Sequence, residues 1–430
     1  MNMMMKLVIP SSLFWVGMVD VGAGGGPVAG QIAAGGHHSL AIHRDGSLWS
    51  WGRNYAGQLG DGSTKDAHSP QRVGEGTDWV AVSAGDHHSV ALRRDGTLWA
   101  WGYNRFGQLG NGAIRDAHTP VLVQGGEDWQ AVAAGDYHTV ALRRDGTLWA
   151  WGCNKRGQVG SGSKPRERKP VRVDDDAWLV IPLETDVRIV QDAHLPTRLG
   201  GDDDWVAIDA GAYYSVARKQ DGSLWAWGDN RYGQMGTATR NHELAPVRIG
   251  EGTGWTAVFA GVHHVLGTRR DGGLWGWGLN EYGQLAPFSE QRLVQALVRT
   301  ETEIDCVRAV GAWHHTLVLD REGALWGWGS NSYGQLGTGD TRDIGATVIR
   351  GTPHHGAFGK QVANASRVPV RVAGASDWID ISAQGHHSIG RKRGGSVWTW
   401  GLNWYGQLGV GSTENQALPV RVILGTVPVP

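Results

Sequence analysis

The sequence lacks the features that usually assign a chemistry to a protein of 430 residues. It contains no HExxH, CxxC, nucleophile-elbow or phosphate-binding loop motif, so it offers no catalytic set and no cofactor site. No run of Lys or Arg interrupts a formal net charge of −1, which argues against a nucleic-acid partner. No apolar run reaches the roughly 20 residues of a membrane-spanning helix. We therefore expect a protein that is not an enzyme, needs no cofactor or metal, and does not span a membrane.

Cysteine is almost absent. The chain has two, Cys153 and Cys306, and they fall in distant copies of the repeat described below. A disulfide requires Cα atoms within about 7 Å, so we expect no bridge between them. Cysteine usage therefore does not indicate a redox compartment.

Phenylalanine is scarce as well, at 5 residues, whereas Gly and Trp reach 67 and 23. This composition is typical of many short strands and tight turns rather than helices. Burial of one Trp side chain contributes about 4–6 kcal/mol as an upper bound, because it removes roughly 150–250 Å² from water. We expect tryptophan to form the core.

A repeat of 50 residues organises the chain. Its clearest copy is Leu98–Gly112, which reads LWAWGYNRFGQLGNG. The first Trp of the seven copies falls at Trp49, Trp99, Trp149, Trp225, Trp275, Trp326 and Trp398. Four of the six intervals are 50 or 51 residues, and self-similarity at that period indicates a solenoid or a propeller.

Each copy predicts a four-stranded antiparallel sheet. In the second copy, Trp79–Gly85 and Ser89–Arg93 alternate large and small residues as strands do. Asp95-Gly96 then forms a hairpin turn, for which we expect type I′ geometry. Thr97–Trp101 returns, and a P-x-x-V element such as Pro120–Val123 supplies the fourth strand. Seven such units predict an all-β, seven-bladed β-propeller, a fold that leaves only short protected edges.

The two ends of the repeat region predict how the ring closes. The region starts at Gln31–Gly35, a strand with no P-x-x-V element before it, and finishes on the P-x-x-V element Pro419–Val422. Joined, these segments complete one blade. We therefore expect a single domain over 31–430, with its ring closed by pairing of the N- and C-terminal segments.

Two connections are longer than the period requires. They lie at 163–200 and 338–369 and exceed it by 26 and about 22 residues. Long excursions from a compact domain are usually functional or disordered, and the sequence leaves both readings open.

Residues 1–30 differ in composition from the repeats. Lys6 precedes the apolar stretch Leu7–Val19, and small residues follow at Val21–Ala23. This is the layout of a secretory signal peptide, although Asp20 lies close to the cleavage zone. We expect an extracellular or periplasmic protein, and the alternative is a cytoplasmic protein with a disordered or loosely docked N-terminus.

Histidine pairs recur at one position of the repeat: His37-His38, His87-His88, His263-His264, His314-His315 and His386-His387. The third and fourth copies have Tyr137-His138 and Tyr213-Tyr214 there. A ring of imidazoles could bind a metal, since His is the commonest metal ligand. Adjacent residues of a strand point to opposite faces, however, and Tyr replaces His. We therefore favour core histidines that hydrogen-bond the neighbouring blade.

The loop W-G-x-N-x-x-G-Q is uniform at its named positions and variable at x. Its Asn is expected to cap backbone groups of the turn. The variable positions are rich in Tyr, Trp and Arg, which are enriched at interface hot spots. We predict a partner-binding ring on one face, made of Tyr55, Arg105, Phe106, Arg156, Arg231, Tyr232, Tyr282, Tyr333, Trp404 and Tyr405. The alternative is that these side chains only cover the seams between blades.

The seven copies of L-W-x-W-G-x-N-x-x-G-Q-L-G, with A-G-x-H-H-S-x-A-L and D-G before each, resemble the repeat of the regulator of chromosome condensation family. The resemblance covers roughly residues 31–423 and implies a seven-bladed β-propeller. The copies depart from the pattern at Ala286, Ala312 and Gln384, where a Gly is displaced. The founding member of that family is a guanine nucleotide exchange factor for a small nuclear GTPase and binds chromatin. No exchange-factor loop can be matched here residue by residue, and no basic tail for chromatin is found.

These patterns predict a non-enzymatic protein-interaction propeller that acts as a monomer. It would bind a protein partner of unknown identity through the loop face and the two insertions. The alternative, which follows from the resemblance alone, is a guanine nucleotide exchange factor or another regulator of a small GTPase.

We expect the protein purified from its native source to begin within or just after Val21–Ala23, because a signal peptidase cuts after small residues. N-terminal sequencing measures this directly. An intact Met1 would rule out secretion by this route.

Overall fold

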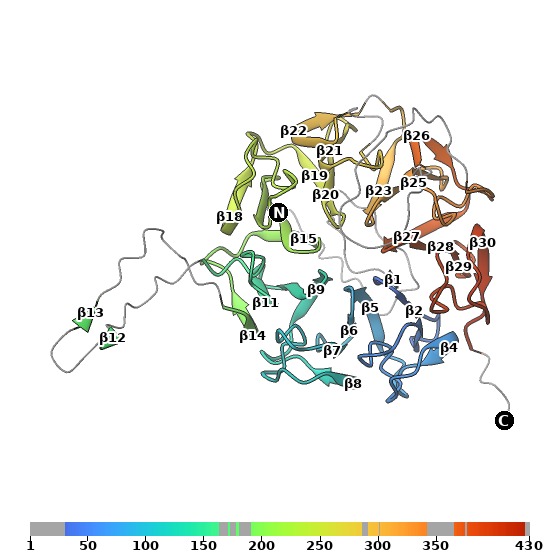
Figure 1. Ribbon diagram of the computed structural model, residues 1–430, viewed down its shortest axis with the longest axis horizontal. Helices are drawn as coiled ribbons and strands as arrows, with labels where there is room; N and C mark the ends of the chain where they lie inside the picture. Colours follow the sequence, from blue (N-terminus) through green and yellow to red (C-terminus); the bar gives the residue numbers. More distant parts are fainter. Residues whose placement is uncertain are drawn as a thin grey trace, which may run out of the picture.

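The computed structural model describes residues 31–162, 171–172, 178–179, 191–285, 291–300, 302–341, 365–374 and 376–425. These residues form seven four-stranded antiparallel sheets, which surround a common axis as blades (Figure 1). The fold is the predicted all-β, seven-bladed propeller. Nowhere in these ranges is there a helix long and apolar enough to cross a membrane. The predicted signal peptide, residues 1–30, lies outside the described residues.

The blades take their strands in chain order, four to a blade. Blade 1 consists of β1 (Ile32–Ala34), β2 (His38–Ile42), β3 (Leu48–Gly52) and β4 (Ala67–Arg72). Blade 2 consists of β5 (Trp79–Ala84), β6 (His88–Arg93), β7 (Leu98–Gly102) and β8 (Ala117–Leu122). Blade 3 consists of β9 (Trp129–Ala134), β10 (His138–Arg143), β11 (Leu148–Gly152) and β14 (Ala193–Arg198). The fourth and fifth consist of β15 (Trp205–Ala210), β16 (Tyr214–Lys219), β17 (Leu224–Gly228) and β18 (Glu243–Ile249); and β19 (Trp255–Ala260), β20 (His264–Arg269), β21 (Leu274–Leu279) and β22 (Leu293–Arg299). The sixth and seventh consist of β23 (Cys306–Gly311), β24 (His315–Asp320), β25 (Leu325–Ser330) and β26 (Ala365–Arg371); and β27 (Trp378–Gln384), β28 (His387–Lys392), β29 (Val397–Gly401) and β30 (Gln416–Val422). A separate two-stranded pair is formed by β12 (Val171–Arg172) and β13 (Trp178–Leu179).

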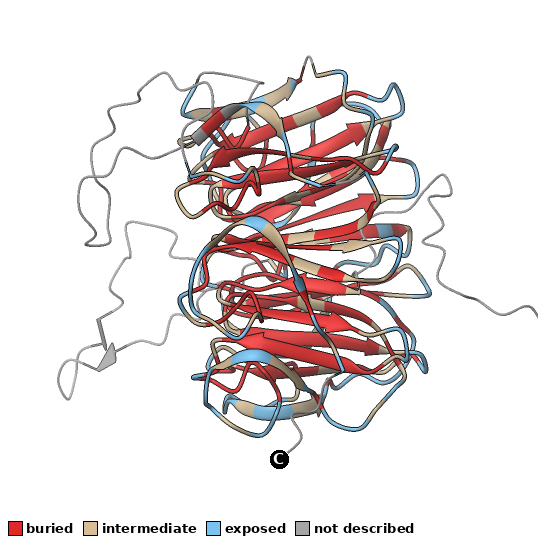
Figure 2. Ribbon diagram, turned by 90° about the vertical axis from the view of Figure 1, so that its right-hand side faces the viewer, coloured by how far each residue is buried: buried red, intermediate tan, exposed pale blue. Residues whose placement is uncertain are grey.

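The first strand of each blade lines the axis, and the fourth is outermost. The inner strands are largely buried, whereas outer strands such as β8 combine exposed and half-buried side chains (Figure 2). The second Trp of every L-W-x-W-G motif is fully buried, at Trp51, Trp101, Trp151, Trp227, Trp277, Trp328 and Trp400. Tryptophan forms the core, as expected.

The Asp-Gly hairpins form where predicted, but the prediction of type I′ geometry for their turns is wrong. In blade 1 the Gly46 N–H donates to His43 O at 2.9 Å, and the His43 N–H donates to Ser47 O at 2.8 Å. Gly46 has φ of +80°, while Asp45 is not among the residues with positive φ. This is a three-residue loop, a type I turn followed by a bulged left-handed Gly. The Asp45 carboxylate selects it by accepting the Ser47 N–H at 2.9 Å.

The ring closes by packing the first blade on the last, not by a shared sheet. Strands β1–β4 form one sheet and β27–β30 another, so the prediction that the terminal segments pair within one blade is wrong. Ile32 of blade 1 instead packs in one apolar cluster with Ile389 and Val422 of blade 7. The terminal segments therefore meet at the closing seam while each completes its own four-stranded blade.

The two predicted insertions include strands of the propeller. β14 pairs with β11 and places Arg198 opposite Trp149, and β26 pairs with β25. The range 163–200 therefore contains the whole of the outer strand β14, and the range 338–369 contains part of the outer strand β26. The residues at 163–170, 173–177, 180–190 and 342–364 lie outside the described residues.

Deletion of residues 165–190 should leave the propeller folded. The interval across them is 76 residues, 26 more than the period, and the deletion restores the spacing. Asp192 would then occupy the loop position of Asp66, because both carboxylates accept the backbone N–H of the loop Asn. We expect a nearly unchanged Tm and an unchanged near-ultraviolet Trp signal. Deletion of 163–200, which also removes β14, serves as the destabilised control, and loss of the Trp signal in the shorter deletion would contradict the expectation.

Candidate partner-binding face

The Asn and Gln of each W-G-x-N-x-x-G-Q loop hold its backbone in one conformation. Asn54 Oδ1 accepts the Leu59 N–H at 2.9 Å, and Gln58 Oε1 accepts the Ala56 N–H at 3.0 Å. The other six loops repeat both bonds. The predicted capping role of Asn is confirmed, and the variable side chains project from seven similarly held backbones.

The backbone carbonyl of the same Gln joins each blade to the next. Gln58 O accepts from Trp101 Nε1 at 2.9 Å and from Ser89 Oγ at 2.8 Å, both in blade 2. The second Trp of the motif makes this bond at all seven seams, including Trp51 to Gln407 O at the closing seam. A buried indole N–H requires an acceptor, so this carbonyl sets the register between two blades.

The second residue of each histidine pair also bonds the next blade. His88 Nε2 lies 3.1 Å from Thr139 Oγ1, and Thr139 donates its one hydroxyl proton to Gln108 O at 3.0 Å. His88 Nε2 must therefore be the donor, which assigns the neutral Nε2–H tautomer. The same contact is made by His38, His138, His264, His315 and His387. The predicted core role of these histidines is confirmed.

The first residue of each pair lies at the end of the axis, on the same face as the loops. His37 and Trp313 belong to blades 1 and 6, which are not neighbours, yet their ring centroids are 5.8 Å apart. His314 and His386 stack at 5.4 Å. We call this set the axial ring; it consists of His37, His87, Tyr137, Tyr213, His263, His314 and His386.

Six of the predicted partner-binding side chains pack against the axial ring. The ring centroids of Tyr282 and His314 are 4.3 Å apart, and those of Tyr232 and His263 are 4.7 Å apart. The same kind of contact, at 5.1–5.7 Å, is made by Tyr55, Phe106, Tyr333 and Tyr405. Each contact reaches from one blade to the next, so these side chains cover the seams, as the alternative interpretation proposed.

Three of the predicted residues are exposed. Tyr55 and Trp404 are 46% and 52% exposed, and Arg105 is exposed as well. The other seven are half-buried. The face is therefore a half-buried aromatic layer from which three large side chains project.

The two half-buried arginines of the prediction, Arg156 and Arg231, have partners within the face. Arg231 Nη2 lies 2.9 Å from Asp229 Oδ2, and Arg156 Nη1 lies 3.3 Å from His242 Nε2. They are less available to a partner than Arg105 is.

Two buried carboxylates beside the axial ring were missed in the sequence. Asp86 and Asp136 follow the A-G of the second and third copies and are 9% and 8% exposed. Asp86 Oδ2 lies 3.1 Å from His87 Nε2. Burial raises the pKa of Asp86, and burial with repulsion from Asp86 raises the pKa of Asp136 well above its usual range. The sequence does distinguish these two carboxylates from the scaffold, because Asp occurs at this repeat position in only two copies. The other five copies have Gly, Ala, Val or Trp there.

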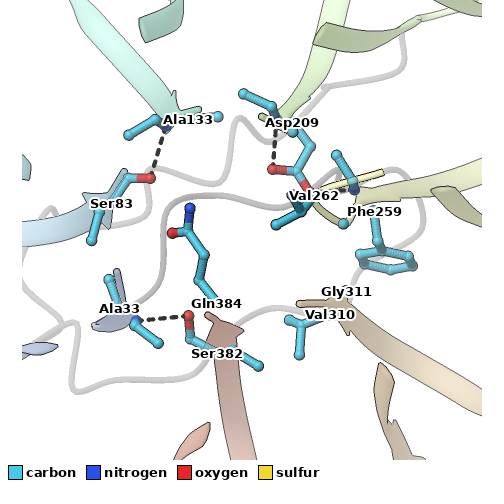
Figure 3. Close-up of a pocket in the computed structure, with 18 of the residues that line it drawn as sticks. Ala33, Ser83, Ala133, Asp209, Phe259, Val262, Val310, Gly311, Ser382 and Gln384 are labelled. Atoms are coloured by element: carbon cyan, nitrogen blue, oxygen red, sulfur yellow. Dashed lines mark hydrogen bonds between the residues drawn. The ribbon is translucent and has the colours of Figure 1, made fainter. Parts of the chain in front are cut away.

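The first strands of the blades enclose a channel of about 110 Å³, room for a few water molecules (Figure 3). Its wall is mostly small and apolar. Ser83, Asp209 and Ser382 each accept a backbone N–H from the first strand of the next blade at 2.8–3.0 Å. Gln384 projects from blade 7 into the channel and donates to Asp136 Oδ1 of blade 3 at 3.1 Å. The channel is thus too small to admit a protein segment. The candidate site is therefore the face of the propeller that carries the W-G-x-N-x-x-G-Q loops.

Comparison with known families matches the whole propeller. A family model described as the RCC1-like domain matches residues 26–350. A second, described as the Regulator of chromosome condensation (RCC1) repeat, matches residues 322–390 and 394–428.

Individual relatives match this chain over part of their length. Ultraviolet-B receptor UVR8 of Arabidopsis thaliana is 28% identical over 215 residues, which is 49% of this chain and 44% of the receptor. The probable E3 ubiquitin-protein ligase HERC4 of Homo sapiens is 28% identical over 224 residues, 52% of this chain and 15% of the ligase. The solved structure of Prp20p from Saccharomyces cerevisiae has a TM-score of 0.70 and 20% identity, and covers 89% of this chain and 87% of its own. The chain spans less than half the length of these two curated relatives, and the structural likeness shows the fold.

Acid should destabilise the propeller through its buried histidines. Burial lowers the pKa of His88, His138, His264 and His387 from 6.5 to about 3. The unfolded chain takes up these protons between pH 6.5 and about 3, whereas the folded chain does not. The free energy of unfolding should therefore fall as the pH is lowered through this window, by up to ~1.4 kcal/mol per pH unit for each histidine.

Urea unfolding of the intact chain and of His88→Gln isolates one such residue. The Gln amide can still donate to Thr139 but takes up no proton. We expect the slope of unfolding free energy against pH to decrease by about one proton in the variant. An unchanged slope would contradict the neutral assignment of His88.

Proposed function

The chain belongs to the RCC1-like domain family, and on this premise we propose that it is a non-enzymatic protein-interaction propeller. It binds a protein partner through the face that carries the W-G-x-N-x-x-G-Q loops. One observation supports this proposal above the others: identical hydrogen bonds hold all seven loops, while the side chains between the held positions differ. A scaffold that fixes its loops and varies their side chains is suited to recognition.

The three projecting side chains have the composition of an interface hot spot. Tyr, Trp and Arg are the residue types whose truncation most often costs an interface more than about 2 kcal/mol. Tyr55, Arg105 and Trp404 stand on blades 1, 2 and 7, which are consecutive around the ring. They therefore define one continuous sector of the face.

Both insertions are proposed to contact the partner, because the chain leaves and rejoins the propeller on the loop face at each of them. They interrupt the connections between the third and fourth strands of blades 3 and 6. The same connections in the other blades are the W-G-x-N-x-x-G-Q loops. Of the two insertions, 163–200 and 338–369, the structure describes 171–172, 178–179, 191–200, 338–341 and 365–369.

The partners of relatives do not identify a partner here. Prp20p of Saccharomyces cerevisiae has binding properties to Gsp1p and histones. In another solved structure, Kap60 is bound to yeast RCC1 (Prp20). The ligase HERC4 matches this chain over 15% of its own length, so ligase activity is not proposed. Nucleotide exchange on, or regulation of, a small GTPase remains the alternative function. We keep an extracellular or periplasmic monomer as part of the proposal, with a cytoplasmic protein as the alternative.

Affinity capture from native extract, followed by identification of the bound protein and measurement of its Kd, tests the proposal. Simultaneous replacement of Tyr55, Arg105 and Trp404 by Ala should raise the Kd at least about thirtyfold, because hot-spot truncation costs roughly 2 kcal/mol. Release of labelled guanine nucleotide from a captured GTPase would select the alternative function.

The matched control replaces three exposed leucines of the outer strands by Ala: Leu122, Leu195 and Leu418, which are 46–49% exposed. This control also removes three large exposed side chains, but from the rim of the ring. We expect it to leave the Kd unchanged. A partner that binds the loop-face variant as tightly as the intact chain would refute the proposed face.

A further inference from the structure

Four exposed cationic side chains lie on the loop face, over three consecutive blades. Arg105 and Arg115 stand on the connection between the third and fourth strands of blade 2, Lys155 on that of blade 3, and Arg240 on that of blade 4. Among the described residues, none of the four forms an ion pair with a carboxylate. We call this set the basic sector, and its charge is available to a partner.

Contacts between the blades join these side chains into one surface. Lys155 Nζ lies 4.6 Å from the ring centroid of Phe106, which neighbours Arg105 in the loop of blade 2. On the other side, Arg156 Nη1 lies 3.3 Å from His242 Nε2 in the loop of blade 4. The basic sector therefore crosses two seams, from blade 2 to blade 3 and from blade 3 to blade 4.

The carboxylates of the same loops are fewer, and they already have partners. Asp116 and Asp192 accept the backbone N–H of the loop Asn at 2.8 Å. Asp229 is fully buried and pairs with an arginine of its own loop at 2.9 Å. Nearer the axis, Asp86 and Asp136 are 9% and 8% exposed, so they are not contact points for a partner. Among the described side chains of these three loops, three carboxylates thus stand against six cations: Arg105, Arg115, Lys155, Arg156, Arg231 and Arg240.

The loops of blades 5, 6 and 7 have no comparable group among their described residues. Arg292 is the one cation described there, and its Nη2 lies 2.7 Å from Glu281 Oε1. Glu414 of blade 7 is exposed. Since all seven loops share one backbone arrangement, charge is what distinguishes one side of the face from the other. An acidic segment is attracted to blades 2–4 and repelled by Glu414.

The side chains of the basic sector suit carboxylate ligands. Three of the four are arginines, whose planar guanidinium can donate two parallel N–H bonds to one carboxylate. The same groups can bind a phosphate, but a nucleic-acid strand requires a longer positive track. The sector covers three of seven blades, and the formal net charge of the chain is −1. These observations favour a short acidic stretch of a protein.

We propose that the basic sector binds an acidic segment of the protein partner. The proposal rests on the proposed function and adds the chemistry of one part of the partner. Arg105 belongs both to the basic sector and to the projecting group with Tyr55 and Trp404. The acidic segment therefore lies over blades 2–4, and the part of the partner that meets the two aromatic side chains lies over blades 1 and 7. Charge thus sets the orientation of the partner on a scaffold whose seven loops are alike.

Binding of N-acetyl-hexaglutamate amide to the full chain tests the proposal, with N-acetyl-hexaglutamine amide as the uncharged probe of the same length. Calorimetry measures both Kd values. At low salt we expect the charged probe to bind at least about tenfold more tightly, and most of this preference to disappear in ~0.5 M NaCl, because salt screens exposed charges. Simultaneous Arg115→Gln, Lys155→Gln and Arg240→Gln should remove the preference, and the near-ultraviolet Trp signal shows whether this variant is folded.

The matched control is the triple variant Arg94→Gln, Arg144→Gln and Arg270→Gln. It removes three exposed cations beside the Asp-Gly turns of the opposite face, so its net charge equals that of the sector variant. We expect it to keep the preference for hexaglutamate. Equal binding of the two probes to the intact chain at low salt would overturn the proposal, and this comparison does not depend on any variant. A preference that survives in the folded sector variant, or that is lost equally in the control, would also overturn it. So would hexathymidylate that binds more tightly than hexaglutamate.

The captured partner separates this proposal from the proposed function. The sector variant should raise the Kd of the partner about tenfold at low salt, because exposed charge pairs each contribute a few-fold in affinity. If the sector variant binds the partner normally while the Tyr55, Arg105 and Trp404 variant does not, the loop face is supported and the acidic segment is refuted. If both variants bind the partner normally, the loop face itself is refuted.

Discussion

The propeller depends on one backbone carbonyl per blade, that of the Gln in the G-Q loop. It accepts the indole N–H of the next blade's second Trp at every seam, and a Ser or Thr hydroxyl of that blade as well at six of them. In six copies a Gly two positions after this Gln fits the same contact, because a Cβ on Gly60 would lie 2.7 Å from Trp101 Nε1; the fifth copy has Ala286 instead. The spacing of Trp, Gln and Gly in the repeat is therefore the spacing of one inter-blade joint.

This joint explains why variation is confined to one part of the loop. Asn54 and Gln58 fix the backbone between them, so the intervening side chains can change without moving the seam. Some of these variable side chains pack over the seam between blades, and others, such as Trp404, reach solvent. The same face thus combines a rigid scaffold with residues that the scaffold does not constrain, which is what a recognition surface requires.

The blades, their strand order and the core role of the histidine pairs could be predicted because each leaves a local pattern in every copy. The turn type could not, because Asp-Gly fits both turns and the choice depends on a bond from the Ser47 N–H to the Asp45 carboxylate. The contact between Gln384 and Asp136 joins residues 248 positions apart across the axis, and the curvature of the ring decides it. The candidate site was predicted in part. The loop residues follow from variation within the repeat, whereas the contact between His37 and Trp313 of blades 1 and 6 appears only once the blades are placed.

The binding face is tested most directly by hydrogen exchange of the intact chain with and without its captured partner. The result we expect is added protection in the loops at 53–57, 103–107 and 402–406 and at the turn that carries Asp86, with none at the Asp-Gly turns of the opposite face. Protection at the Asp-Gly turns, or along outer strands such as β8 alone, would contradict a binding face built on the G-Q loops.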